Sequence, residues 1–111
     1  MAREHSLSSF ELIVMLTIIR LDENAYGVPI SEEIEKRTGR KVSIGGVYAA
    51  LERLEAKRYV RSELGEATAE RGGRAKKYFS VTSNGLRVVR TTRLVLVNLW
   101  NGLPGLEGGK A

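Results

Sequence analysis

The chain has 111 residues and no cysteine, and 18 lysine and arginine residues outnumber 13 acidic ones to give a net charge of +5. This length allows one domain with a modest core, and the lack of cysteine excludes a disulfide framework and a thiolate zinc site. No stretch approaches the roughly 18 apolar residues of a membrane helix, and no apolar segment follows Arg3 as in a signal peptide, so we expect a cytoplasmic protein with no membrane partner.

The positive charge is concentrated after the first third of the chain. Residues 1–39 have a net charge of −3, residues 40–78 of +5 and residues 79–111 of +3. A basic surface attracts nucleic acid or acidic membranes through its long-range potential. The charge alone does not separate these partners, so the motifs along the chain must do so.

The first helix is expected to begin after Ser8 and to end near Leu21. Ser8 and Glu11 have the spacing of a capping box, in which each side chain accepts a hydrogen bond from the other's backbone N–H. The polar run Asp22-Glu23-Asn24 predicts a turn. A series of apolar residues predicts a mostly buried helix: Leu12, Ile13, Met15, Leu16, Ile18 and Ile19.

Two further helices follow, joined by a short turn. The second follows Ala25-Tyr26-Gly27, has Pro29 in its first turn and ends at Gly39, which suits the left-handed position after a helix. The third begins at Ser43, whose hydroxyl can cap the first turn, and runs to Lys57. Two helices joined in this way, the second after a basic run, are typical of a helix-turn-helix.

The third helix has two different faces. Apolar residues at i, i+4 and i+7 predict a buried stripe: Val47, Leu51 and Leu54. The opposite face is unusually small: Gly45, Ala49, Arg53 and Ala56. Small side chains let a helix approach another surface closely, and the positive end of its dipole suits a phosphate. We therefore interpret this segment as a DNA-recognition helix.

A hairpin is expected next, with strands at residues 60–64 and 77–81. The connecting loop holds a glycine pair among cations: Arg71, Gly72, Gly73, Arg74, Lys76 and Lys77. An antiparallel pair with a basic tip after a helix-turn-helix is a wing. The alternative is a solvated loop whose charge serves solubility.

The last helix is expected to begin after Thr82. Apolar residues and one threonine follow a heptad spacing: Val89, Thr92, Leu96, Leu99 and Leu103. With Trp100 this is more apolar surface than a terminal helix can bury against a small core, and a large apolar patch marks an interface. We interpret the segment as a dimerisation helix, with a helix that folds back on its own core as the alternative.

These elements predict a mostly helical α+β fold, a winged helix-turn-helix with a C-terminal dimerisation helix. The expected divisions are a DNA-binding domain at 1–81, the dimerisation helix at 82–103 and a flexible tail at 104–111. An enzyme is not expected, because His5 is the one histidine and no paired acids suggest a catalytic pocket. No cofactor and no metal are expected.

Three motifs stand together in this chain: Ser43-x-Gly-x-Val-Tyr-x-x-Leu-x-Arg-Leu-Glu-x-Lys, Gly65-Glu and Arg71-Gly-Gly-Arg-x-Lys-Lys-Tyr-Phe-x-Val-Thr-x-x-Gly85, with Ala25-Tyr26-Gly27 before them. With these motifs, about residues 7–86 resemble the PadR family of bacterial transcriptional regulators. The short chain is similar to the small subfamily with a single C-terminal helix. The resemblance implies a homodimer that binds pseudo-palindromic operator DNA, usually as a repressor. It also implies that a small aromatic effector could bind against Trp100.

Two positions depart from the family pattern. Ala49 stands where many members have proline, which removes a helix-kinking constraint. Arg58 stands where many have glycine, and a non-glycine residue in the left-handed region costs roughly 1 kcal/mol.

The residues expected to contact double-stranded DNA lie on the third helix and the wing: Lys41, Ser43, Gly45, Gly46, Tyr48, Arg53, Arg71, Gly72, Gly73, Arg74, Lys76 and Lys77. Arg53 could reach a phosphate or a guanine edge, and Tyr48 could serve either a phosphate or the core. The residues expected at the dimer interface are Val89, Leu96, Leu99, Trp100 and Leu103. The alternative function is a winged-helix interaction module whose basic face meets an acidic protein.

Overall fold

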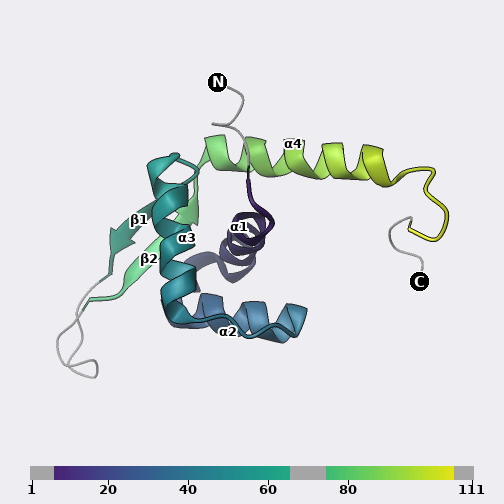
Figure 1. Ribbon diagram of the computed structural model, residues 1–111. Helices are drawn as coiled ribbons and strands as arrows, with labels where there is room; N and C mark the ends of the chain where they lie inside the picture. Colours follow the sequence, from purple (N-terminus) through teal and green to yellow (C-terminus); the bar gives the residue numbers. More distant parts are fainter. Residues whose placement is uncertain (1–6, 66–74, 107–111) are drawn as a thin grey trace.

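The computed structural model describes residues 7–65 and 75–106, which form four α-helices, one 3-10 turn and a two-stranded antiparallel sheet. In chain order the elements are α1 (Ser9–Leu21), η2 (Asp22–Asn24), α2 (Gly27–Thr38), α3 (Ile44–Ala56), β1 (Val60–Leu64), β2 (Lys77–Val81) and α4 (Ser83–Trp100). Figure 1 shows α1, α2 and α3 gathered into one body, with the hairpin projecting from one side and α4 from the other. The expected winged helix-turn-helix fold is therefore confirmed.

Local capping begins three of these helices as predicted. The Ser8 hydroxyl accepts from Glu11 N at 3.1 Å while Glu11 Oε1 accepts from Ser8 N at 2.9 Å, which is a complete capping box. The Ser43 hydroxyl accepts from Gly46 N at 2.9 Å. The Thr82 hydroxyl accepts from Gly85 N at 3.0 Å. These bonds satisfy backbone donors that a helix leaves open in its first turn.

The core lies between α1, α2, α3 and the sheet, and its largest contributors are buried apolar side chains: Met15, Ile18, Ile30, Ile34, Val47, Leu51, Leu54 and Phe79. The expectation that α1 is mostly buried is wrong for Leu16 and Ile19, which are 47% and 42% exposed. α1 packs against α2, α3, β2 and α4, but these neighbours leave Leu16 and Ile19 partly open to solvent. An apolar run along a helix does not reveal how many neighbours the helix has.

The two expected strands pair antiparallel, with Val60 opposite Val81 and Leu64 opposite Lys77. β2 is also tied to the segment before α2, because Phe79 N donates to Ala25 O at 2.8 Å. Tyr59, immediately before β1, is 1% exposed, and sequence reasoning did not identify it as a core residue.

α3 ends in a Schellman motif built around Arg58. Arg58 N donates to Glu55 O and Tyr59 N donates to Leu54 O, both at 3.0 Å. Arg58 has φ 66°, so the helix ends in the left-handed conformation that glycine usually supplies. Gly39 has the same role after α2, with φ 76°.

The start of α4 is held against the end of α3. Thr82 N donates to Tyr59 O at 3.0 Å and the Thr82 hydroxyl donates to Arg58 O at 2.8 Å. Gly85 lies so close that a Cβ on it would collide with the carbonyl oxygen of Tyr59. α4 ends at Trp100, so Leu103, expected on the helical seam, lies in the turn that follows. Among helices in the described ranges, none is both long and apolar enough to cross a membrane.

Candidate nucleic-acid interface

The N-terminus of α3 is exposed and rigidly joined to α2. The Ser31 hydroxyl donates to Val42 O at 3.0 Å across the turn between the two helices. Lys41 and Ser43 are exposed beside that turn. This end of α3 therefore presents backbone N–H groups and a cation to solvent in a fixed position.

The structure gives a reason for glycine at position 46 but none at position 45. A Cβ on Gly46 would lie 3.1 Å from the Ser43 Oγ, so the cap itself favours glycine there. A Cβ on Gly45 would meet nothing within 4 Å. Glycine costs a helix about 1 kcal/mol relative to alanine in its interior, so packing within the chain does not explain Gly45. Its bare backbone suits a surface that approaches from outside.

Tyr48 is half-exposed and links three elements. A Cβ on Gly27, the first residue of α2, would collide with the Tyr48 hydroxyl and ring. The Tyr48 ring centroid lies 6.4 Å from that of Phe79 on β2, in an edge-on arrangement. These contacts support the core role that the sequence left open for Tyr48. The contact of its hydroxyl with a phosphate stays a prediction, and Tyr48 is 38% exposed.

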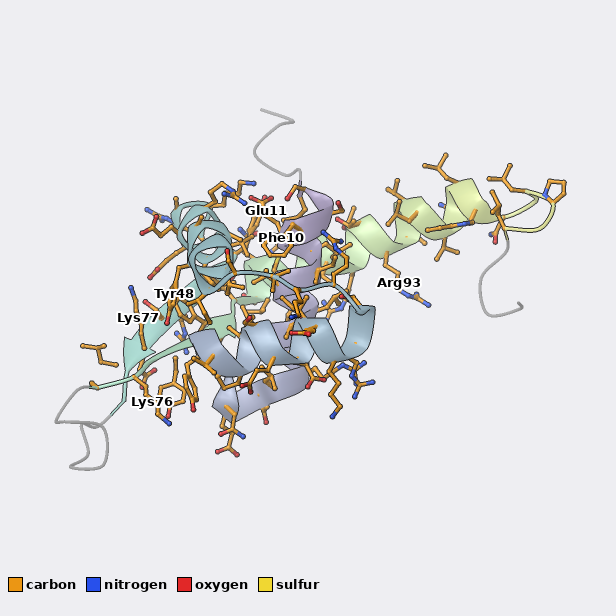
Figure 2. The ribbon with its side chains drawn as sticks, turned by 60° about the horizontal axis from the view of Figure 1, so that its bottom comes forward. Phe10, Glu11, Tyr48, Lys76, Lys77 and Arg93 are labelled. Carbon is orange, nitrogen blue, oxygen red and sulfur yellow. The ribbon has the colours of Figure 1, made fainter. Side chains whose placement is uncertain are left out.

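Two wing lysines lie beside aromatic rings at the loop end of the hairpin strands. Lys76 Nζ donates to the Tyr26 hydroxyl at 3.0 Å and lies 4.2 Å from the centre of that ring. Lys77 Nζ lies 5.8 Å from the Phe79 ring, and Lys77 is exposed. Figure 2 shows Lys76 and Lys77 on the hairpin side of the molecule, with Lys77 the nearer of the two to Tyr48. The other expected wing residues, Arg71, Gly72, Gly73 and Arg74, lie outside the described residues.

The C-terminal half of α3 carries an ion-pair cluster that sequence reasoning missed. Arg53 Nε donates to Glu11 Oε2 at 3.0 Å, and Lys57 Nζ lies 3.1 Å from Glu11 Oε1. Glu11 is only 3% exposed, at the start of α1 (Figure 2). Burial raises the pKa of Glu11, but hydrogen bonds from Ser8 N–H, Arg53 and Lys57 outweigh that effect and hold the pKa below its ordinary value. The Glu11 carboxylate therefore stays charged and fixed.

Among the expected site residues, Tyr48 and Lys77 both lie beside the Phe79 ring, Lys76 lies on Tyr26, and Arg53 is held by Glu11. Sequence reasoning placed Arg53 on the small face but gave it no intramolecular partner. The pairing with Glu11 spans 42 residues, so only the packing of α1 against α3 reveals it. Among the described residues, no three acidic, histidine or cysteine side chains gather where they could hold a metal ion.

The residues expected at the dimer interface divide into two groups. Val89 is partly buried and packs against the chain's own core. The others are exposed: Leu96 37%, Leu99 67%, Trp100 45% and Leu103 44%. Leu96, Leu99, Trp100 and Leu103 line an open hollow of about 220 Å³. The apolar end of α4 therefore does not fold back on the described part of the chain.

The helix pair α2–α3 with a β-hairpin after it defines the class: a winged helix-turn-helix with an open recognition helix. The chain belongs to the PadR-like family of transcriptional regulators, whose family model matches residues 15–91. Members of this family are DNA-binding regulators rather than enzymes, and DNA-binding regulation is the activity that the membership supports.

Solved structures agree with this assignment. The chain is similar to a PadR-like transcription factor from Bacteroides fragilis, at 26% identity over 81% of this chain and 82% of that one, with a TM-score of 0.69. It is similar to a PadR family transcriptional regulator from Eggerthella lenta, at 28% identity over 78% and 73%, with a TM-score of 0.65. A transcriptional regulator from Clostridium thermocellum has the same fold at 24% identity over 78% and 80%, with a TM-score of 0.66. No curated protein matches the chain significantly in sequence.

Proposed function

We propose that the chain is a sequence-specific DNA-binding repressor that acts as a homodimer on a pseudo-palindromic operator. The observation that carries the DNA-binding part is the bare outer face of α3, where Gly45 leaves backbone open to an approaching surface. Lys41, just before α3, and Lys77, at the start of β2, supply exposed cations. Cations of this kind bind phosphates and position the protein, while contacts from the helix read the bases.

We propose the following division of roles. Lys41, Ser43 and the glycine pair bring the end of α3 against a phosphate or into the major groove. Lys76 and Lys77 track the backbone and enter the minor groove, together with Arg71 and Arg74, which lie outside the described residues. The recognition face offers few side chains that read bases, so spacing between half-sites and DNA shape carry much of the specificity. Half-sites lie roughly 34–36 Å apart, or a multiple of that distance.

The dimer part of the proposal rests on α4. Its apolar end is exposed along Leu96, Leu99 and Trp100, and apolar patches of this kind mark protein interfaces. A second copy of α4 is the occupant we propose. The proposed domain division is a DNA-binding unit at 1–81, a dimerisation segment at 82–103 and a tail at 104–111.

The decisive experiment starts from a pool of random duplex DNA. The wild-type chain is used to select binding sites, and fluorescence anisotropy then compares the selected site with a scrambled one at physiological salt. We expect selected sites with two-fold symmetry and specific binding at least a thousand-fold tighter than non-specific binding, the low end of the usual range. Equal binding to both duplexes would contradict sequence-specific recognition and favour an acidic protein partner for the basic face. Lower transcription in vitro from a template carrying the selected site tests the repressor role.

An effector site is proposed at the hollow beside Trp100. Planar aromatic compounds could stack on the indole ring between two α4 helices. Quenching of tryptophan fluorescence reports binding directly, because Trp100 is the single tryptophan in the chain. Release of the selected DNA by the same compound, and no release from a Trp100→Leu variant, would support an effector. A compound that quenches without releasing DNA would contradict regulation through this hollow.

A further inference from the structure

Glu11 lies on α1, outside the helix-turn-helix, yet its carboxylate is fixed against the recognition helix. Its side chain is 4% exposed and accepts from Ser8 N, Arg53 Nε and Lys57 Nζ at 2.9–3.1 Å. We propose that Glu11 is a positioning residue for DNA specificity, which holds the Arg53 guanidinium so that its two terminal nitrogens meet one guanine edge. This inference rests on the proposed DNA-binding function.

The form of the ion pair leaves Arg53 able to bind a second partner. Only Nε of Arg53 donates to Glu11, at 3.0 Å, and the Arg53 side chain is 52% exposed. Arginine reads guanine with two donors directed at the O6 and N7 atoms. An arginine held at Nε keeps the two terminal nitrogens for that contact, and the planar guanidinium cannot rotate freely while it is held. The Glu11 contact thus fixes the direction of the fork.

Lys57, the second cation of the cluster, prevents Glu11 from forming a bidentate pair with the Arg53 guanidinium. Oε1 accepts from Ser8 N at 2.9 Å and from Lys57 Nζ at 3.1 Å. Oε2 accepts from Arg53 Nε at 3.0 Å and, at the longer distance of 3.3 Å, also from Lys57 Nζ. A bidentate carboxylate–guanidinium pair would need both oxygens for Arg53. Because Oε1 is already engaged, the pair remains single, and the remaining face of Arg53 is available to DNA.

The position of Arg53 on α3 suits one base contact. Gly45, Ala49 and Arg53 are four residues apart, so they share one helical face, and all three are exposed. The two small residues let the helix backbone lie close to the groove, and Arg53 is the long side chain that extends from the same face. Arg53 lies about 12 Å along the axis from Gly45, at a rise of 1.5 Å per residue. It therefore reads one base pair in each half-site.

The test uses the full chain and the duplex that the wild type selects from a random pool. Binding is measured to that duplex and to variants with each base pair changed in turn, for the wild type, Glu11→Gln and Arg53→Lys. Both variants should lose about tenfold or more of the discrimination at one guanine position in each half-site, and keep discrimination elsewhere. Arg53→Lys retains the charge but not the fork, so its salt dependence should match the wild type.

Matched controls separate positioning from folding. Glu55→Gln removes the same charge from a carboxylate that accepts from the Ser62 hydroxyl at 2.7 Å, and its discrimination pattern should be that of the wild type. Adding Glu11→Gln to Arg53→Ala should not reduce discrimination further, because Glu11 acts through Arg53.

The outcomes distinguish this inference from the proposed function. If Glu11→Gln weakens binding to every duplex by the same factor, Glu11 has only a structural role and the inference fails. If Glu11→Gln does not fold, an unchanged pattern in Arg53→Lys would still overturn it. If the wild type selects no site, the proposed function itself fails.

Discussion

The ring of Tyr48 on α3 lies directly against the backbone of Gly27, the first residue of α2. This contact joins the two helices of the helix-turn-helix, and it leaves no room for a Cβ at position 27. Gly27→Ala places a methyl group on the Tyr48 ring and should destabilise the fold by roughly 1–2 kcal/mol, as overpacking does. Urea unfolding measures the change in the free energy of unfolding.

The same contact predicts non-additivity. In a Tyr48→Ala background, Gly27→Ala should cost about 1 kcal/mol less, because the ring that it meets is gone. The four proteins of this cycle are compared by the same urea titration. Equal costs in both backgrounds would show that Gly27 is constrained by something other than Tyr48.

The Glu11 cluster predicts a stability that depends on pH. Hydrogen bonds keep the pKa of Glu11 below its ordinary value of about 4.5, so its contribution is fully present above that pH and is lost as pH falls through the lowered pKa. Glu11→Gln should lower the free energy of unfolding by about 1–2 kcal/mol at neutral pH, since it removes charged hydrogen bonds from partly exposed partners.

Below the lowered pKa of Glu11 the difference between wild type and Glu11→Gln should shrink toward zero. Urea unfolding from about pH 7 to about pH 3 provides the measurement, with the same window applied to both proteins. A difference that stays constant over this range would mean that the Glu11 charge does not stabilise the fold.

Arg58 is a position at which the chain can be stabilised. Its φ of 66° strains a residue with a Cβ, and Arg58→Gly should raise the free energy of unfolding by about 1 kcal/mol. Gly39→Ala is the reverse control, because Gly39 has φ 76° and open space around the Cβ position, so only backbone strain changes. Thermal unfolding should move the two variants in opposite directions. A lower Tm for Arg58→Gly would mean that the arginine side chain contributes more than its backbone costs.

Gly45 and Gly85 should respond oppositely to alanine. Gly85→Ala collides with the Tyr59 carbonyl oxygen and should destabilise the chain by about 2 kcal/mol or more. Gly45→Ala meets nothing within the chain, so its stability should be unchanged or raised by less than about 1 kcal/mol. DNA affinity should nevertheless fall for Gly45→Ala. Undiminished DNA affinity in Gly45→Ala would contradict the proposed close approach of α3 to DNA.

The apolar end of α4 predicts an effect on assembly. Leu96→Asp buries a carboxylate in the proposed seam and should give a monomer at concentrations where the wild type sediments as a dimer. Leu64→Asp is the control, because Leu64 is 70% exposed on β1, away from α4. If the Leu96→Asp variant formed a dimer as stable as that of the wild type, the proposed interface at the apolar end of α4 would be wrong.

The parts of the fold that depend on neighbours in sequence could be predicted from it. The Ser8, Ser43 and Thr82 caps act within three residues. The strand at residues 60–64 lies between the expected end of the third helix at Lys57 and Gly65. What could not be predicted depends on how helices pack. Glu11 and Arg53 meet only because α1 packs against α3. The carbonyl oxygen of Tyr59 is covered because Thr82 and Gly85, at the start of α4, lie against it.

Long-range packing also decides which apolar residues are exposed. Leu16 and Ile19 belong to the same apolar run as Met15 and Ile18, but they lie on a face of α1 that no described element covers. A sequence pattern identifies apolar positions, whereas the number of helices around them is set by the topology. Site residues such as Gly45 could be proposed from the residue type alone. The role of Glu11 was missed because it depends on a partner that is distant in sequence.

The bonds from Thr82 to Arg58 O and Tyr59 O have a mechanical consequence. They fix the start of α4 to the end of α3, so α4 and the recognition helix should move together as one rigid unit. The 18 residues of α4 extend about 27 Å from that junction, and a tilt of about 10° displaces the far end by about 5 Å, more than one base-pair step. In any assembly joined through α4, a small change in the angle at which two α4 helices meet would therefore be enough to bring two recognition helices into or out of phase with the turns of a duplex.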